Sequence, residues 1–132
     1  LKPLAKIASG GEMSRVMLAL KTVLVDADGI GTFIFDEIDT GVSGKTARKV
    51  GEKMSLLGKK RQILCITHLP QIAAMADNHF RIEKHVAEGR TTTTVETLDE
   101  NASCREIARL MGGEEITETT MAAARELRRD KP

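Results

Sequence analysis

Two adjacent acidic residues follow a short apolar run, and their carboxylates are candidates for metal binding and for proton transfer. The run spans residues 32–35, and Asp36 and Glu37 come directly after it. Such a run predicts a strand buried on both faces of a parallel sheet, with the acids at its carboxyl end, where ligands bind in open α/β sheets. A carboxylate there can hold Mg²⁺ beside bound phosphates, and a second can orient or deprotonate water. Asp36 is the candidate magnesium ligand and Glu37 the candidate base, although both acids can also simply cap the following turn.

A pair of glycines opens a predicted helix at residues 10–25. Ser9 and Glu12 have the spacing of a capping box in front of helically spaced apolar residues. Free backbone N–H groups and the helix dipole make such a start an anion site. The capping box accounts for Ser9 and Glu12, but each glycine in the first turn costs up to about 1 kcal/mol relative to alanine. This cost favours a phosphate-binding role for Gly10 and Gly11.

A histidine follows a second apolar run, at residues 62–67. The run predicts another buried strand, so His68 comes to the same edge of the sheet as the two acids. Its imidazole can donate a hydrogen bond to a terminal phosphate, although a lone histidine is more often a structural residue. The position after a strand favours a functional role for His68. His79 and His85 lack such a position and are interpreted as structural.

Helices and strands alternate along the rest of the chain. A turn-rich segment at residues 39–44 leads into a predicted helix at residues 45–57 that has one basic face. A short helix at residues 69–76 is expected next, opened by Pro70, and then an antiparallel hairpin at residues 79–98 that has Phe80, Ile82 and Val95 inward and a turn at Glu88-Gly89. A further helix is expected to begin at a capping box of Ser103 and Glu106 and to end at Gly112-Gly113. The last expected elements are a helix at residues 117–129 and a frayed tail at residues 128–132. This order predicts an α/β fold with a mostly parallel sheet, flanking helices and a marginal antiparallel hairpin.

Composition limits the classes of function. The 20 Lys and Arg residues balance 19 Asp and Glu residues, so the net charge of +1 gives no global reason to favour nucleic acid or an anionic membrane. With 3 Phe and no Trp or Tyr, stacking platforms for single-stranded nucleic acid are nearly absent. The 132 residues suffice for a single domain, 1–132. Two separated cysteines and the lack of a membrane-spanning apolar stretch predict a cytoplasmic protein without membrane contact.

In this order and spacing, the motifs resemble those of the C-terminal lobe of an ABC-type ATPase head, a P-loop NTPase fold. Residues 9–12 are similar to the signature motif, and residues 32–37 are similar to the Walker B strand and its acids. Residues 39–44 resemble the D-loop, and His68 resembles the switch histidine. The signature has Ala8 where Leu is usual and Glu12 where Gln is frequent. These departures argue against a transporter subunit.

A closer resemblance, from Pro3 to about Gly113, is to the RecN family of bacterial SMC-like DNA repair ATPases. It is carried by residues 9–15, 35–44 and 66–73. In that family the Walker A loop lies in an N-terminal lobe beyond a long coiled coil, and this sequence has no Gly-x-x-x-x-Gly-Lys-Ser/Thr motif. Because the chain also starts without Met, we expect it to be a fragment, the C-terminal half of a head, which cannot hydrolyse ATP alone.

The resemblance implies a homodimer of heads that sandwiches ATP and Mg²⁺. The nucleotide of the partner head is then contacted by Ser9, Gly10, Gly11 and Glu12. The nucleotide of the same head is acted on by Asp36, Glu37 and His68. The D-loop contains Asp39, Gly41 and Ser43. The implied partners are the Walker A lobe of the same protein, a second head and DNA. The implied function is ATP-dependent DNA double-strand break repair and recombination, with a cytoplasmic, nucleoid-associated location.

Two alternatives remain open. The chain can be the head lobe of another SMC-type or ABC ATPase, and a long heptad region before Leu1 would favour an SMC-like protein over a transporter. It can also be a DNA-phosphate-binding module that uses the basic segment Lys45–Arg61. Glu52 interrupts that basic cluster and no base-reading residues accompany it, so a solvated helix face is favoured.

Overall fold

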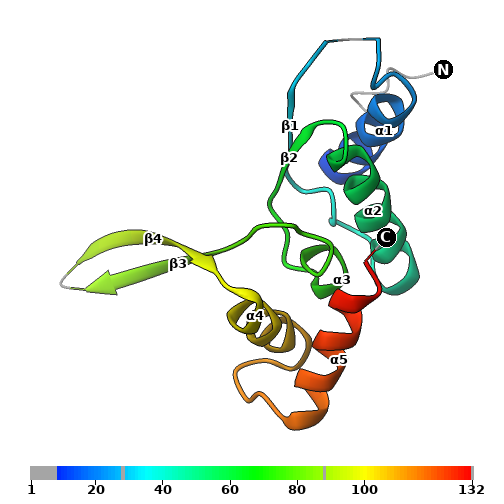
Figure 1. Ribbon diagram of the computed structural model, residues 1–132. Coiled ribbons are helices and arrows are strands. Elements are labelled where there is room, and N and C mark those ends of the chain that lie inside the picture. Colours follow the sequence, from blue (N-terminus) through cyan, green and yellow to red (C-terminus); the bar gives the residue numbers. More distant parts are fainter. Residues whose placement is uncertain (1–8, 28, 88, 132) are drawn as a thin grey trace.

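The computed structural model describes residues 9–27, 29–87 and 89–131, and it has an α/β body from which a hairpin projects (Figure 1). The helices are Gly10–Val23 (α1), Gly44–Gly58 (α2), Pro70–Ala73 (α3), Glu100–Gly112 (α4) and Glu118–Arg129 (α5). The strands are Thr32–Phe35 (β1), Gln62–Cys65 (β2), His79–Ala87 (β3) and Arg90–Leu98 (β4). The predicted order of elements is therefore confirmed. Among the described residues no helix is long and apolar enough to cross a bilayer.

β1 and β2 form a parallel pair that is covered on one face. Phe35 lies opposite Cys65, and Phe33 and Phe35 pack into a core with residues of α1 and α2. Both helices lie on the same side of the pair (Figure 1). On the other side, Ile34 is 70% exposed. The expected burial on both faces is therefore wrong, because within the described residues only one layer of helices packs on this small sheet.

A second core lies where α3, α4 and α5 meet. Its buried residues are Ala73, Ala74, Ile107, Ala108 and Ala124. α4 begins earlier than predicted, because the side chain of Asp99 caps it by accepting the N–H of Ala102 at 2.7 Å. Ser103 and Glu106 are therefore buried inside the helix, and the expectation that they form its capping box is wrong. The Ser-x-x-Glu pattern is short enough to occur within a helix, so the pattern alone does not locate a helix start.

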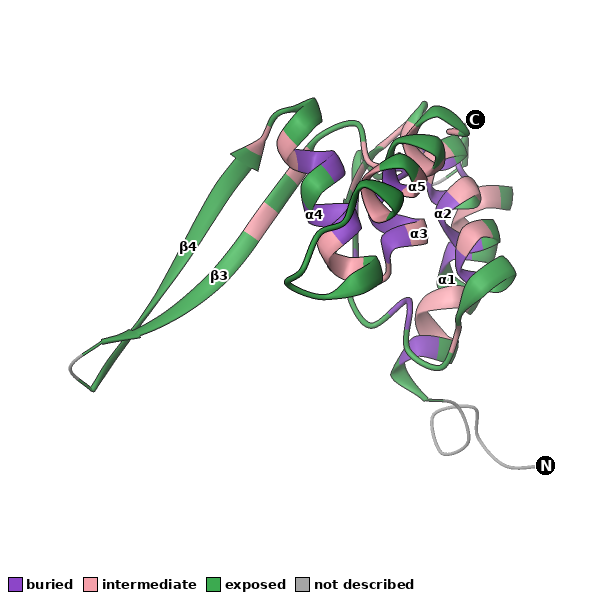
Figure 2. Ribbon diagram, turned by 90° about the horizontal axis from the view of Figure 1, so that it is seen from below, coloured by how far each residue is buried: buried purple, intermediate pink, exposed green. Residues whose placement is uncertain are grey.

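The hairpin of β3 and β4 is antiparallel, as predicted, but it forms a sheet of its own instead of the margin of the parallel sheet. Its strands are exposed over most of their length (Figure 2). Phe80, Ile82 and Val95 are each more than half exposed, so the expectation that they point inward is wrong. Gly89 has the positive φ of a turn residue, whereas Glu88 lies outside the described residues.

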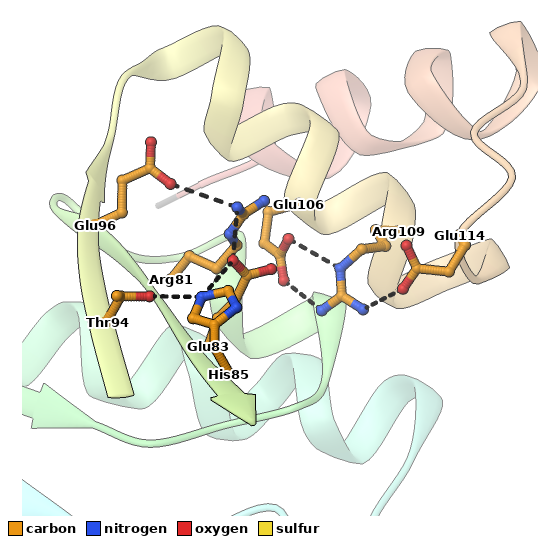
Figure 3. A network of polar contacts seen from close by, with 8 residues as sticks. All are labelled: Arg81, Glu83, His85, Thr94, Glu96, Glu106, Arg109 and Glu114. Carbon is orange, nitrogen blue, oxygen red and sulfur yellow. Dashed lines mark hydrogen bonds and ion pairs between the residues drawn. The ribbon is translucent and has the colours of Figure 1, made fainter. Parts of the chain in front are cut away.

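The opposite face of the hairpin is polar and meets α4 (Figure 3). Arg81 contacts Glu83 at 3.0 Å and Glu96 at 3.5 Å. On α4, Glu106 forms an ion pair with Arg109 at 2.6 Å, and its pKa is lowered by the hydrogen bond from Arg109. At the root of the hairpin, His79 Nδ1 lies 2.7 Å from the hydroxyl of Ser103. The contact between His79 and Ser103 joins the root of the hairpin to α4, and it agrees with a structural role for His79.

The C-terminal residues are held against the body of the protein. Arg128 donates two hydrogen bonds to the carboxylate of Glu100, at 2.7 and 2.8 Å, and a third to the carbonyl of Ala76 at 3.3 Å. Lys131 forms an ion pair with Asp77. The expected fraying is therefore wrong for residues 128–131, because Arg128, Asp130 and Lys131 have partners on other elements.

Replacing Arg128 by alanine is expected to reduce the free energy of unfolding by about 1 kcal/mol. The guanidinium is largely buried, but its partner Glu100 is mostly exposed, so solvent screens the ion pair. Arg129→Ala is the matched control, because Arg129 is exposed on the same helix and its loss is expected to change stability by less than about 0.5 kcal/mol. Urea denaturation of the two variants tests this, and equal midpoints would contradict it.

Candidate functional site

The start of α1 has the predicted capping box. The hydroxyl of Ser9 accepts the N–H of Glu12 at 3.3 Å, and the carboxylate of Glu12 accepts the N–H of Ser9 at 2.8 Å. The bond from the N–H of Ser9 and a second bond from its hydroxyl, at 3.1 Å, lower the pKa of the Glu12 carboxyl group, the backbone bond most of all. Ser9, Gly10 and Glu12 are exposed, so this helix end is accessible.

The loop after β1 lies across the start of α1. Gly11 is buried, and a Cβ atom at this position would lie 2.8 Å from the carbonyl oxygen of Glu37 and 2.9 Å from that of Thr40. The carboxylate of Glu37 lies against Gly10. Close packing within the chain therefore explains why residue 11 has no side chain, which the capping box alone left unexplained. A phosphate contact by Gly11 stays a prediction.

Two further residues of α1 bind the same loop. Ser14 donates a hydrogen bond to the carbonyl of Asp36 at 2.8 Å. Arg15 donates to the carbonyls of Ile38 and Thr40 at 3.2 and 2.7 Å. Sequence reasoning assigned no role to Ser14 or Arg15. Their spacing of three and four residues from Gly11 puts all three on one helix face and was the available signal.

Asp36 and Glu37 occupy the carboxyl end of β1, and both are exposed. One carboxylate oxygen of Asp36 accepts the N–H of Glu37 at 2.9 Å, and among the described residues the other oxygen accepts no hydrogen bond. A carboxylate with one free oxygen suits Mg²⁺, which usually keeps waters and binds substrate phosphates beside one or two carboxylates. The described residues contain no cluster of three or more metal-ligating side chains. Asp36 therefore fits a magnesium ion that phosphates help to hold.

Glu37 has an unusual backbone conformation. Its φ of 57° lies in the left-handed region, which costs a residue with a side chain about 1–3 kcal/mol. The hydrogen bonds from Ser14 and Arg15 to the neighbouring carbonyls hold the loop in this shape. Strain of this kind is concentrated at functional sites, so it supports a functional role for the loop.

The ends of β1 and β2 are joined through Asp39. Its side chain is only 4% exposed, and its Oδ2 accepts hydrogen bonds from Thr67 Oγ1 at 2.7 Å and from the N–H of His68 at 3.0 Å. Nδ1 of His68 lies 3.0 Å from the same oxygen. His68 therefore lies at the same sheet edge as Asp36, as its position after a strand predicted. Sequence reasoning missed the link through Asp39, because nothing local pairs residues 28 positions apart.

Asp39 makes a pH-dependent contribution to stability. Burial by itself raises its pKa, but the hydrogen bonds from Thr67 and His68 outweigh burial and bring the pKa below the usual value of 3.8. The stabilisation is therefore fully present above about pH 4 and is lost as the pH falls through the lowered pKa. Asp39→Asn is expected to destabilise the protein by about 2 kcal/mol at pH 6 and by less at pH 3. Urea denaturation at both pH values tests this, and a pH-independent difference would contradict it.

The other two predicted D-loop residues lie on the surface. Gly41 is exposed and has a φ of 74°, which glycine adopts without strain. Ser43 precedes α2 at the N-cap position, but its exposed hydroxyl makes no capping hydrogen bond. Both residues are therefore accessible to a partner, in contrast to buried Asp39.

The basic segment at residues 45–61 is partly neutralised by contacts within the chain. Arg48 pairs with Glu52 and Asp130, at 3.0 and 3.5 Å. Lys60 pairs with Asp26 at 2.9 Å. The exposed lysines that remain on α2 are Lys45, Lys49 and Lys53. This partial neutralisation favours a solvated helix face over a module that binds DNA phosphates.

Comparison with known proteins supports the class that the motifs predicted. The chain is similar to a solved structure of an SMC ATPase, which is described for ATP-driven dimerization and DNA-stimulated activation. The match covers 83% of this chain and 66% of the SMC ATPase chain, with a TM-score of 0.58 and 20% sequence identity. The fold is therefore that of an α/β lobe of an ABC-type ATPase head. No protein-family model matches the chain.

In sequence, the chain is RecN-like over nearly its whole length. It is 52% identical to the DNA repair protein RecN of Halalkalibacterium halodurans and 50% identical to that of Bacillus subtilis, each over 96% of the chain. The RecN of Treponema pallidum is 49% identical over 97% of the chain. The resemblance inferred from the motifs is thus confirmed. The chain spans 22% of the length of each of these relatives.

Proposed function

We propose that residues 1–132 are the C-terminal lobe of a RecN-like ATPase head that acts in ATP-dependent DNA double-strand break repair and recombination. The observation that carries the proposal is that Asp36 and Glu37 follow one strand of a parallel pair and His68 follows the other, with the two strand ends joined through Asp39. In this role Asp36 holds Mg²⁺, which would neutralise charge on the terminal phosphates. Glu37 orients or deprotonates the attacking water, and His68 contacts the terminal phosphate.

A second set of residues suits contact with another head. Ser9, Gly10, Gly41 and Ser43 are exposed, so the nucleotide or D-loop of a second copy can reach them. The carboxylate of Glu37 now lies against Gly10. In this proposal the carboxylate of Glu37 turns away before a phosphate reaches the start of α1, because the carboxylate and the phosphate are both negative and repel each other at close range. Hydrolysis then depends on dimerisation of heads.

The uncovered face of the β1–β2 pair supports a partner lobe. Ile34, Leu64 and Ile66 are all exposed on this face, and parallel sheets occur almost only with both faces covered. A two-stranded sheet is also too small to be stable by itself. The longer RecN relatives contain additional chain that can supply the cover. We propose that a lobe with the Walker A loop packs against this face.

The test combines this chain with an N-terminal segment of the Bacillus subtilis RecN relative that carries a Walker A loop. The combined lobes, called the assembled head below, are expected to hydrolyse ATP, whereas either lobe alone is not. Ser9→Arg is expected to abolish turnover without preventing assembly of the lobes, because it blocks the start of α1 for the second head. Turnover by this chain alone, or a stable but inactive mixture, would overturn the proposal.

A further inference from the structure

We propose that Asp39 is a positioning residue that holds the imidazole of His68 in one orientation and one tautomer, with the proton on Nδ1. Nε2 is then the ring nitrogen that meets a ligand. The catalytic consequence of this arrangement rests on the proposed function, whereas the arrangement itself does not.

The geometry around Asp39 fixes both the backbone and the ring of His68. Oδ2 of Asp39 lies 3.0 Å from the backbone nitrogen of His68 and 3.0 Å from Nδ1 of its ring. Thr67 donates to the same oxygen at 2.7 Å and in turn accepts the N–H of Leu69 at 3.1 Å. Asp39 itself is 4% exposed, so these neighbours leave it little freedom to move. The segment after β2 is therefore organised around one carboxylate.

The tautomer follows from the chemistry of the carboxylate. An ionised carboxylate can only accept hydrogen bonds, so a nitrogen 3.0 Å from it must carry a proton. The two donors from Thr67 and the backbone favour the ionised form of Asp39. Nδ1 of His68 is therefore the protonated nitrogen of the neutral ring, and Nε2 carries the lone pair.

A purely structural role for Asp39 explains less. The hydrogen bonds from Thr67 and from the backbone of His68 are sufficient to hold the segment after β2 in place, and they do not require a contact with the ring. The ring is 73% exposed, so packing does not hold it in place. The contact of 3.0 Å between Nδ1 and the carboxylate is therefore the interaction that orients the ring.

This arrangement determines how His68 can act on a phosphate. With its proton on Nδ1, the neutral ring offers a lone pair at Nε2 and can accept a proton or a hydrogen bond there. It can donate from Nε2 to a phosphate oxygen only when the ring carries both protons, and Asp39 then supplies the opposite charge. A hydrogen bond from Nε2 to a terminal phosphate therefore requires a proton on each ring nitrogen.

The tautomer can be measured by NMR of the 132-residue chain with ¹⁵N-labelled histidine, at a pH at which the ring is neutral. Long-range correlations from the carbon-bound ring protons to the nitrogens distinguish a protonated from a bare nitrogen, and His79→Gln and His85→Gln assign the signals. The wild type is expected to have the proton of His68 on Nδ1. In Asp39→Ala the acceptor beside Nδ1 is removed, so the preference for a proton on Nδ1 is expected to be lost and the population of the tautomer with the proton on Nε2 to rise.

Two controls separate this role from general damage to the fold. The signals of His79 and His85 are expected to be unchanged in Asp39→Ala. Thr67→Val removes one bond to Asp39 without touching the ring, and is expected to keep the proton on Nδ1. A wild-type ring with its proton on Nε2, or an unchanged tautomer in a folded Asp39→Ala variant, would overturn the proposal.

The consequence for catalysis is measured in the assembled head. Asp39→Ala is expected to reduce kcat by about 10- to 100-fold, as is typical when the partner that orients a functional histidine is lost, and to leave the KM for ATP nearly unchanged. A loss confined to KM would contradict the positioning role. If the wild-type assembled head had no turnover, the proposed function would fail, while the NMR result would still decide the tautomer.

Discussion

Replacing Glu37 by glutamine is expected to slow ATP hydrolysis by the assembled head about 10²- to 10⁴-fold. This is the range that a general base contributes, and glutamine keeps the size of the side chain but cannot accept a proton. Steady-state phosphate release measures the effect, and binding of ATP to the same variant is expected to persist. Such a result would show that the residue acts on the chemical step.

The matched control is Glu115→Gln. Glu115 is an exposed glutamate between α4 and α5, far in sequence from the strand ends, and its amide is expected to leave turnover unchanged. A Glu37→Gln head that hydrolysed ATP at the wild-type rate would remove the base from the proposed mechanism. The strained backbone at Glu37, with its φ of 57°, would then need another explanation.

Adding one methyl group at Gly11 is expected to destabilise the protein, although alanine is the better helix former. The added Cβ would lie 2.8 Å from the carbonyl oxygen of Glu37 and 2.9 Å from that of Thr40, both of which are backbone atoms that cannot turn aside. Overpacking of this kind costs about 1–3 kcal/mol, which exceeds the gain of about 1 kcal/mol in helix propensity. Gly11→Ala is therefore expected to lose up to about 2 kcal/mol in urea denaturation.

Gly58→Ala is the control for this substitution. Gly58 also lies in a helix, but its added Cβ would meet Ile63 at 3.8 Å, an ordinary van der Waals distance. This variant is expected to be at least as stable as the wild type. A Gly11→Ala protein with wild-type stability would show that the loop at residues 37–40 can move away from α1 at little cost. The close packing would then no longer explain the glycine.

The sequence by itself determined the features that depend on near neighbours. The capping box of Ser9 and Glu12, the type and order of the helices and strands, and the placement of Asp36 and His68 after strands were all predictable. Capping and periodic burial are local, because the residues that make them lie within a few positions of each other. The likeness to RecN was also visible, since its motifs are short and contiguous.

Tertiary structure alone decided which distant residues meet. Packing of α1 on the loop after β1 explains Gly11, and pairing of β1 with β2 brings Asp39 to His68. Asp99, rather than Ser103, caps α4, and Arg128 forms hydrogen bonds with Glu100 that composition could not reveal. The physical reason is that such contacts depend on how whole elements pack. Spacing along the chain limits which residues share a face, but it does not determine which faces come together.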